Sequence, residues 1–133
     1  MAVELSPDDE SRDAEGPDQE ETGNRPGENG QDREPEEKLA YFLEMLKSEN
    51  IGWRWKAAES LARLGDLRAV DPLIGTLRDE DWRVRQKAAW ALGYLGDPKA
   101  IIPLRRAYRD EREGVREIIM EALDMIKEQM ARH

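Results

Sequence analysis

The chain has 133 residues, no cysteine and a formal net charge of -9. A chain of this length holds one domain of ordinary size and leaves no room for a second core. The absence of Cys excludes a disulfide framework, a thiolate nucleophile and any Cys-ligated zinc or iron–sulfur site.

Residues 1–35 are expected to be a disordered acidic tail, and residues 36–133 the folded domain. Residues 1–37 carry 14 acidic and 3 basic side chains, whereas residues 38–133 carry 16 acidic and 18 basic ones, so the negative charge belongs to the tail. After Leu5 the tail has almost no apolar side chain, and it cannot bury enough surface to offset the entropy of ordering. The tail either only keeps the protein soluble or regulates the folded part.

The start of the chain, MAVELSPDDE, lacks the basic and apolar regions of a secretory signal. No apolar run approaches the length of a membrane span. We therefore expect a soluble, cytoplasmic protein that does not enter a membrane.

Helical periodicity begins near residue 36 and continues to the end of the chain, and it repeats. Sliding the sequence over itself by 31 residues superimposes LGDLRAVDPL, which starts at Leu64, on LGDPKAIIPL, which starts at Leu95. Self-similarity at a fixed period is typical of a solenoid built from stacked supersecondary units.

Each repeat is predicted to contain two helices, A and B. Gly65 and Gly96 supply the left-handed conformation that ends an A helix, and Asp66 and Asp97 follow as N-caps of the B helices. Residues 36–47 align with the B helices, so the predicted order is B, A-B, A-B, A, with six helices. The predicted A helices are 50–64, 81–95 and 112–130, and the predicted B helices are 67–78 and 98–109.

Pro72 and Pro103 fall six residues after the two capping aspartates. A proline there removes one backbone hydrogen bond, so it either bends the B helix or delays its regular start. Because it recurs, every repeat is expected to curve in the same way.

The segment DEDWRVRQKAAWALGYLGDPKAIIPLRRAYRD, residues 79–110, resembles the HEAT-like repeat of the phycobilisome-lyase type. The shared features are D-x-x-x-x-V-R, A-A-x-A-L, L-G-D and A-x-x-P-L, and the resemblance covers residues 38–127. It implies an all-α fold, a short right-handed α-α superhelix with A helices on the convex face and B helices on the concave face. It also implies a structural ladder between repeats, in which Arg85 pairs with a loop aspartate; its expected members are Arg54, Arg85, Arg116, Asp66 and Asp97.

The four tryptophans are expected to play different parts. Trp53 aligns with core valines, and Trp90 is expected to pack between neighbouring A helices. Trp55 and Trp82 flank basic residues and are expected to be partly exposed, either as interaction hot spots or packed against the first B helix near Tyr41.

The B helices carry a basic pattern that suits partner binding. If they line one side of the solenoid, they form a basic groove; the alternative is an ordinary solvated face. The hypothetical partner-binding residues are Arg78, Lys99, Arg105, Arg106, Arg109, Trp55 and Trp82. On the last helix, Met120 and Met125 are adaptable enough to form a weak dimer seam, and the chain is otherwise expected to be a monomer.

The sequence offers no catalytic, cofactor-binding or metal-binding residues, so we expect no enzyme and no cofactor. The only histidine is His133, at a terminus that should fray. The expected function is a scaffold that binds another protein with an acidic segment. The alternatives are nucleic-acid binding by the basic groove and, through the family resemblance, an accessory subunit of a lyase-type enzyme.

Overall fold

The computed structural model describes residues 34–132. The acidic tail expected over residues 1–35 and the terminal His133 lie almost wholly outside the described residues. The helices within them are α3 (Pro35–Met45), α4 (Ile51–Leu64), α5 (Val70–Thr76), α6 (Trp82–Leu95), α7 (Ile101–Arg109) and α8 (Glu113–Arg132), with 3₁₀ turns at Leu67–Ala69 and Pro98–Ala100.

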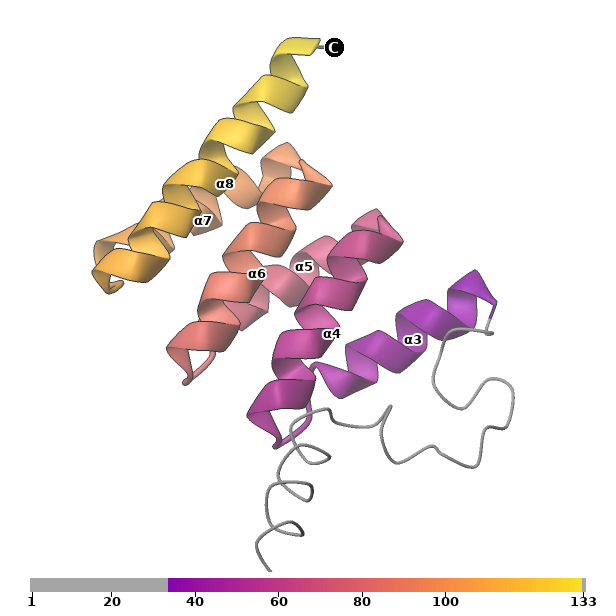
Figure 1. Cartoon of the computed structure of the whole chain (residues 1–133). Coiled ribbons are helices and arrows are strands. Elements are labelled where there is room, and N and C mark those ends of the chain that lie inside the picture. Colours follow the sequence, from indigo (N-terminus) through magenta and orange to yellow (C-terminus); the bar gives the residue numbers. More distant parts are fainter. Residues whose placement is uncertain (1–33, 133) are drawn as a thin grey trace, which may run out of the picture.

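The A helices α4, α6 and α8 lie side by side, and the B helices α5 and α7 lie together behind them (Figure 1). Helix α6 packs against both α4 and α8, and each B helix packs against the A helix that follows it in the chain. The order of helices is therefore B, A-B, A-B, A, and the prediction of an all-α solenoid is confirmed. None of the described helices is both long enough and apolar enough to span a membrane.

One continuous core runs between the two layers, and residues at equivalent positions of the repeat form it. Leu61 of α4 and Leu92 of α6 are 31 residues apart in the sequence, and both are buried. Leu73 of α5 and Leu104 of α7 have the same spacing and are also buried. Small residues such as Ala58 and Ala89 are fully buried between the A helices and allow close approach. Equivalent positions therefore meet equivalent neighbours in each repeat.

The predicted turn between A and B helices is confirmed in both copies. Gly65 and Gly96 have φ of 76°, a left-handed conformation that glycine adopts without steric cost. The Asp66 and Asp97 carboxylates accept hydrogen bonds of 2.9 Å from the backbone N–H groups of Arg68 and Lys99. The loop thus ends one helix and starts the next within three residues.

The recurrent prolines mark a delayed helix start. The segments that contain α5 and α7 each begin with a 3₁₀ turn, and regular α-helix begins only at Val70 and Ile101. Pro72 and Pro103 are therefore third residues of α5 and α7. A proline costs little there, because the N–H groups of a first turn have no partner within the helix.

Asp81 is the N-cap of α6, and a cation holds it in the ionised form. Its carboxylate accepts from the backbone N–H of Arg83 at 2.8 Å and pairs with the Arg83 guanidinium, also at 2.8 Å. The hydrogen bond from this guanidinium lowers the pKa of Asp81 from 3.8 to about 2. Because the folded-state pKa is depressed, the carboxylate stabilises the fold above its unfolded pKa, and this contribution is lost as pH falls through the folded pKa.

We predict that D81N flattens the acid dependence of stability. Asparagine keeps the capping acceptor but does not titrate, so the variant should lose less free energy of unfolding than the unsubstituted chain between about pH 5 and about pH 2. Urea unfolding followed by circular dichroism measures this difference. D124N, on the exposed side of α8, is the control and should show the unsubstituted pH dependence.

Gly93 permits the close contact between α6 and α8. A Cβ atom built on Gly93 would lie 2.7 Å from the Cα of Ala122 and 3.3 Å from the Sδ of Met125. Real Cβ atoms do not approach backbone so closely, and any side chain at this position would therefore push the last helix outward.

The substitution G93A should lower the free energy of unfolding by about 1–3 kcal/mol through overpacking, even though alanine favours a helix. Gly75 in α5 is the matched control, since nothing lies within 4 Å of a Cβ built there. G75A should leave stability unchanged or raise it by up to about 1 kcal/mol. Equal urea midpoints for the two variants would contradict this account of the α6–α8 contact.

Candidate partner-binding surface

A buried arginine joins the first repeat to the second. Arg54, in the first turn of α4, is 7% exposed. Its Nε and Nη2 donate to the two carboxylate oxygens of Asp79 at 2.8 and 3.1 Å, and its Nη1 donates to the carbonyl of Ser48 at 2.8 Å. The fork–fork pair with Asp79, above all its hydrogen bonds, raises the pKa of Arg54. One guanidinium thus joins the loop after α3 to the loop after α5.

Arg85 makes the same connection one repeat later. Its Nη2 donates to Glu111 at 3.2 Å, and its Nη1 donates to the carbonyl of Asp79 at 2.7 Å. Arg116 donates to the carbonyls of Tyr108 and Arg109, each at 3.0 Å, and its guanidinium lies 5.0 Å from the centre of the Tyr108 ring. Each of the three arginines therefore donates to a backbone carbonyl of the loop before its own helix. The first two also pair with a carboxylate of the next loop.

The prediction that Asp66 and Asp97 are the acidic members of this ladder is wrong. Asp66 and Asp97 act as N-caps, and the Arg68 guanidinium, which pairs with Asp66 at 2.7 Å, lowers the pKa of that carboxyl. Asp79 and Glu111 take the expected place. They follow Arg54 and Arg85 by 25 and 26 residues, and only the stacking of one repeat on the next brings them into contact.

Removing Arg54 should cost about 3 kcal/mol, because R54A leaves the Asp79 carboxylate buried without its cation. R63A is the control: Arg63 pairs with Glu59 on the surface of α4 at 3.2 Å. Such an exposed pair contributes less than about 0.5 kcal/mol. Chemical denaturation of both variants tests whether the ladder or surface charge in general stabilises the stack.

Two hollows lie next to each other along the B helices. The first, of about 520 Å³, lies between α5 and α7, and its lining includes Ile74, Pro103, Arg78 and Arg106. The second, of about 430 Å³, lies between α3 and α5. Gly75, Arg78 and Asp79 line both hollows, so the two hollows form one surface that crosses the three B helices. We call this surface the B groove.

The structure brings only some of the predicted basic residues into the B groove. Arg78 and Arg106 line it together, from neighbouring helices. Arg105 and Arg109 are exposed on α7 outside its lining. Lys99, in the 3₁₀ turn before α7, pairs with Asp71 at 3.3 Å, and both side chains are largely exposed.

Sequence reasoning missed Lys47, which lines the B groove between α3 and α5. The 31-residue offset would have found it, since it aligns Lys47 with Arg78 and Arg109. All three side chains are exposed, and within residues 34–132 none of them pairs with a carboxylate. Each stands at the carboxyl end of a B helix.

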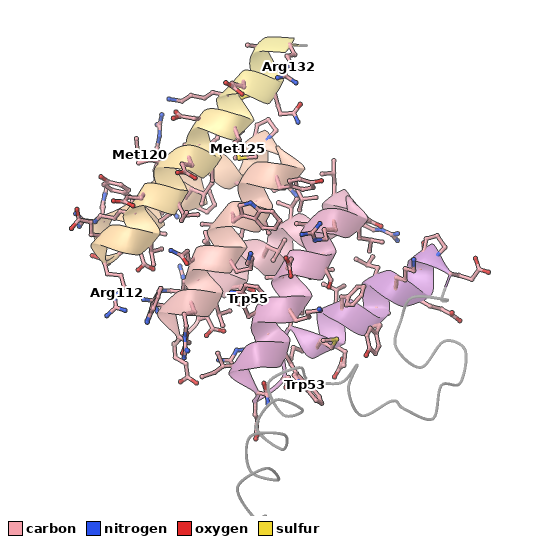
Figure 2. The ribbon with its side chains drawn as sticks, viewed as in Figure 1. Trp53, Trp55, Arg112, Met120, Met125 and Arg132 are labelled. Atoms are coloured by element: carbon pink, nitrogen blue, oxygen red, sulfur yellow. The ribbon has the colours of Figure 1, made fainter. Side chains whose placement is uncertain are left out.

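Trp55 and Trp82 do not belong to this surface, contrary to their grouping with the basic residues. Both are partly exposed, as expected, but they lie on the A helices α4 and α6. The Lys87 ammonium stands 4.4 Å from the centre of the Trp55 ring, and the Arg112 guanidinium stands 5.1 Å from that of Trp82. Figure 2 shows Trp55 between α4 and α6. These rings stabilise contacts between A helices through cation–π attraction.

The remaining aromatic predictions hold in part. Trp90 packs against the core and stacks on Tyr94 at 5.3 Å, with the Lys87 ammonium 4.5 Å from its ring centre. Trp53 also packs against the core, but its indole N–H is buried without an acceptor among the described residues.

The two methionines of the suggested dimer seam differ in their surroundings. Met120 is 47% exposed on the outer side of α8, whereas Met125 lies toward α6 and Gly93 (Figure 2). Met125 is therefore part of the packing within the chain, and a seam built from both side chains would have to break that contact.

The fold defines a short α-helical repeat solenoid with a groove on its B layer. The family model for HEAT repeats matches residues 39–124, and the chain belongs to this family. The comparison with curated proteins gave no match.

Proposed function

We propose that this protein is a non-enzymatic scaffold whose B groove holds an acidic segment of another protein. HEAT repeats generally serve as protein-interaction scaffolds. The observation that carries the proposal is the row of exposed cations without local carboxylate partners beside a groove with apolar lining. Guanidinium groups suit this task because they bind carboxylates in a bidentate manner.

The acidic residues that line the B groove leave its cations free to bind an added carboxylate. Asp79 and Glu111 also line it, but their carboxylates pair with Arg54 and Arg85. Asp110 is the remaining acid at this hollow, set against Arg78 and Arg106. An acidic peptide would therefore meet an excess of positive charge above an apolar floor that includes Ile74 and Pro103.

Two other functions rest on the same surface or on the family resemblance. Nucleic acid would bind the same cations through its phosphates, but the folded part carries a net charge of only +2 over residues 38–133. Similarity to the phycobilisome-lyase type of repeat favours a third reading, an accessory subunit of a lyase-type enzyme. We place both behind the protein scaffold, and we propose that it works in the cytoplasm as a monomer or weak dimer.

The acidic N-terminal residues are proposed to modulate binding. Residues 1–37 have a net charge of -11, opposite in sign to the cations of the B groove. They end in the first turn of α3, and α3 forms one wall of the groove. A tethered polyanion competes with any acidic partner for the same cations.

The charge-reversal pair R78E/R106E should weaken binding of a fluorescein-labelled polyglutamate peptide about tenfold, because about 1.4 kcal/mol of attraction is lost or turned to repulsion. Fluorescence anisotropy in low salt measures the Kd. R63E/R132E makes the same change in net charge on α4 and α8, away from the groove, and should change the Kd less than about twofold.

Affinity capture with and without nuclease distinguishes protein partners from nucleic acid. Material that the unsubstituted chain captures from source lysate, and that R78E/R106E does not capture, should be protein. Its capture should persist after nuclease treatment. Capture that nuclease abolishes would favour the nucleic-acid reading, and equal peptide binding by both double variants would refute the B-groove proposal.

A further inference from the structure

We propose that two copies of this chain pair through the outer side of α8, antiparallel and around a two-fold axis at Met120. The surface is a stripe of five residues, which we call the outer stripe: Glu113, Arg116, Met120, Asp124 and Lys127. It is a different surface from the B groove, and the pairing gives the weak dimer proposed above a defined geometry.

The outer stripe lies along one side of a single helix. Helix α8 runs without interruption from Glu113 to Arg132, and the members of the stripe follow one another at intervals of three or four residues. Residues at these intervals lie above one another on a helix. All five are exposed except Arg116, which is partly exposed. The stripe therefore presents one surface about 21 Å long.

The outer stripe occupies the side of α8 on which a further A helix would pack. The 31-residue offset aligns Met120 with Ala89 and Asp124 with Gly93. Ala89 is fully buried, and a Cβ atom built on Gly93 would lie 2.7 Å from the Cα of Ala122 in α8. Because methionine and aspartate are much larger than alanine and glycine, α8 cannot receive a neighbour in this close manner. The occupant of this side must therefore match the side chains of the stripe itself.

The charges of the outer stripe are complementary to themselves when the helix is reversed. Four and seven residues before Met120 stand a cation and an anion, Arg116 and Glu113. Four and seven residues after it stand an anion and a cation, Asp124 and Lys127. In an antiparallel pair with Met120 on the axis, residues at equal distances from the axis meet. Arg116 then meets Asp124 of the second copy. Glu113 meets Lys127, and the symmetry repeats both contacts.

The charged groups of the outer stripe are free to make these contacts. Within residues 34–132, Glu113, Asp124 and Lys127 form no ion pair. The hydrogen bonds of the Arg116 guanidinium go to backbone carbonyls, whereas the other two ladder arginines also bind carboxylates. In the proposed pair, the second copy supplies the carboxylate that Arg116 lacks in the described part of the chain.

A hollow beside Met120 gives the pair an apolar centre. It has a volume of about 570 Å³, and its lining includes Tyr108, Arg116 and Met120. In the proposed pair the Met120 side chain of the second copy enters this hollow and packs against Tyr108. Methionine suits this place, because its thioether is flexible and makes favourable contacts with aromatic rings.

The pair should be weak. One helix from each copy makes an interface below the size of a stable dimer. Each copy has a net charge of -9, and Glu117 adds negative charge beside the hollow, so the two copies repel one another. We expect a Kd on the order of 0.1–1 mM, so the chain is a monomer at the micromolar concentrations of an unfolding experiment.

A charge swap within the outer stripe tests the pairing, with sedimentation equilibrium of the full chain from micromolar to millimolar concentration as the measurement. E113K and K127E each place like charges opposite one another at two symmetry-related contacts, so each should raise the Kd about three- to tenfold. E113K/K127E exchanges the charges and restores both contacts. Its Kd should therefore return to within about twofold of the unsubstituted value.

E121K and R132E are the matched controls. They make the same changes in net charge at exposed positions of α8 outside the outer stripe, and each should change the Kd less than about twofold. M120E places two carboxylates at the axis and should leave the chain monomeric at millimolar concentration. Circular dichroism checks that each variant retains its helices.

The double variant decides between this pair and any other form of self-association. If E113K/K127E associates no better than the two single variants, or if the unsubstituted chain remains a monomer at millimolar concentration, the antiparallel pair is overturned. Binding of the polyglutamate peptide to the B groove is measured separately, so either hypothesis can fail while the other stands.

Discussion

The contact on which the rest of the structure depends is the buried arginine fork at the start of an A helix. Arg54 binds the carbonyl of Ser48 in one loop and the carboxylate of Asp79 in the next, which fixes how far one repeat is displaced from its neighbour. Fixed displacement turns a 31-residue sequence period into rows of equivalent side chains along the surface. The same contact also occupies the Asp79 carboxylate, and Arg85 does so for Glu111. Because these two carboxylates are already paired, they do not neutralise Arg78 and Arg106, which line the same hollow.

The surface cations of the A layer lie against aromatic rings, whereas those that border the B groove do not. On the A layer, Lys87 lies between the rings of Trp55 and Trp90, and Arg112 lies over Trp82. These cations already have partners that help the A helices pack. On the B layer, Arg78 and Arg106 border a hollow and have no such partner among the described residues. A ligand therefore gains most from charge on the B layer.

The sequence could predict features that are local or periodic. Gly65 and Asp66 define the turn within a few residues of each other, and the 31-residue offset identifies the helices and their order. The partner of Arg54 could not be read in this way, because Asp79 meets it only after two repeats have stacked. The same holds for Trp82, because Arg112, the residue just before α8, reaches its ring only after α6 and α8 have packed. The 31-residue offset also predicts an equivalent place for Lys47, Arg78 and Arg109, which the charge of a single helix does not indicate.

A surface of this size suits exchange of ligands rather than permanent attachment. Three exposed ion pairs contribute about 1–3 kcal/mol in total, and salt screens them further. Ordering the backbone of a tethered segment costs about 1–2 kcal/mol per residue, so charge alone does not keep several of its residues docked. A partner that adds an apolar side chain of its own can also fill the hollow beside Ile74 and Pro103, and burial of each methylene there contributes about 0.8 kcal/mol. In the proposed function, charge alone would therefore give the acidic N-terminal residues only a weak hold on the B groove, and a partner with an apolar side chain would displace them.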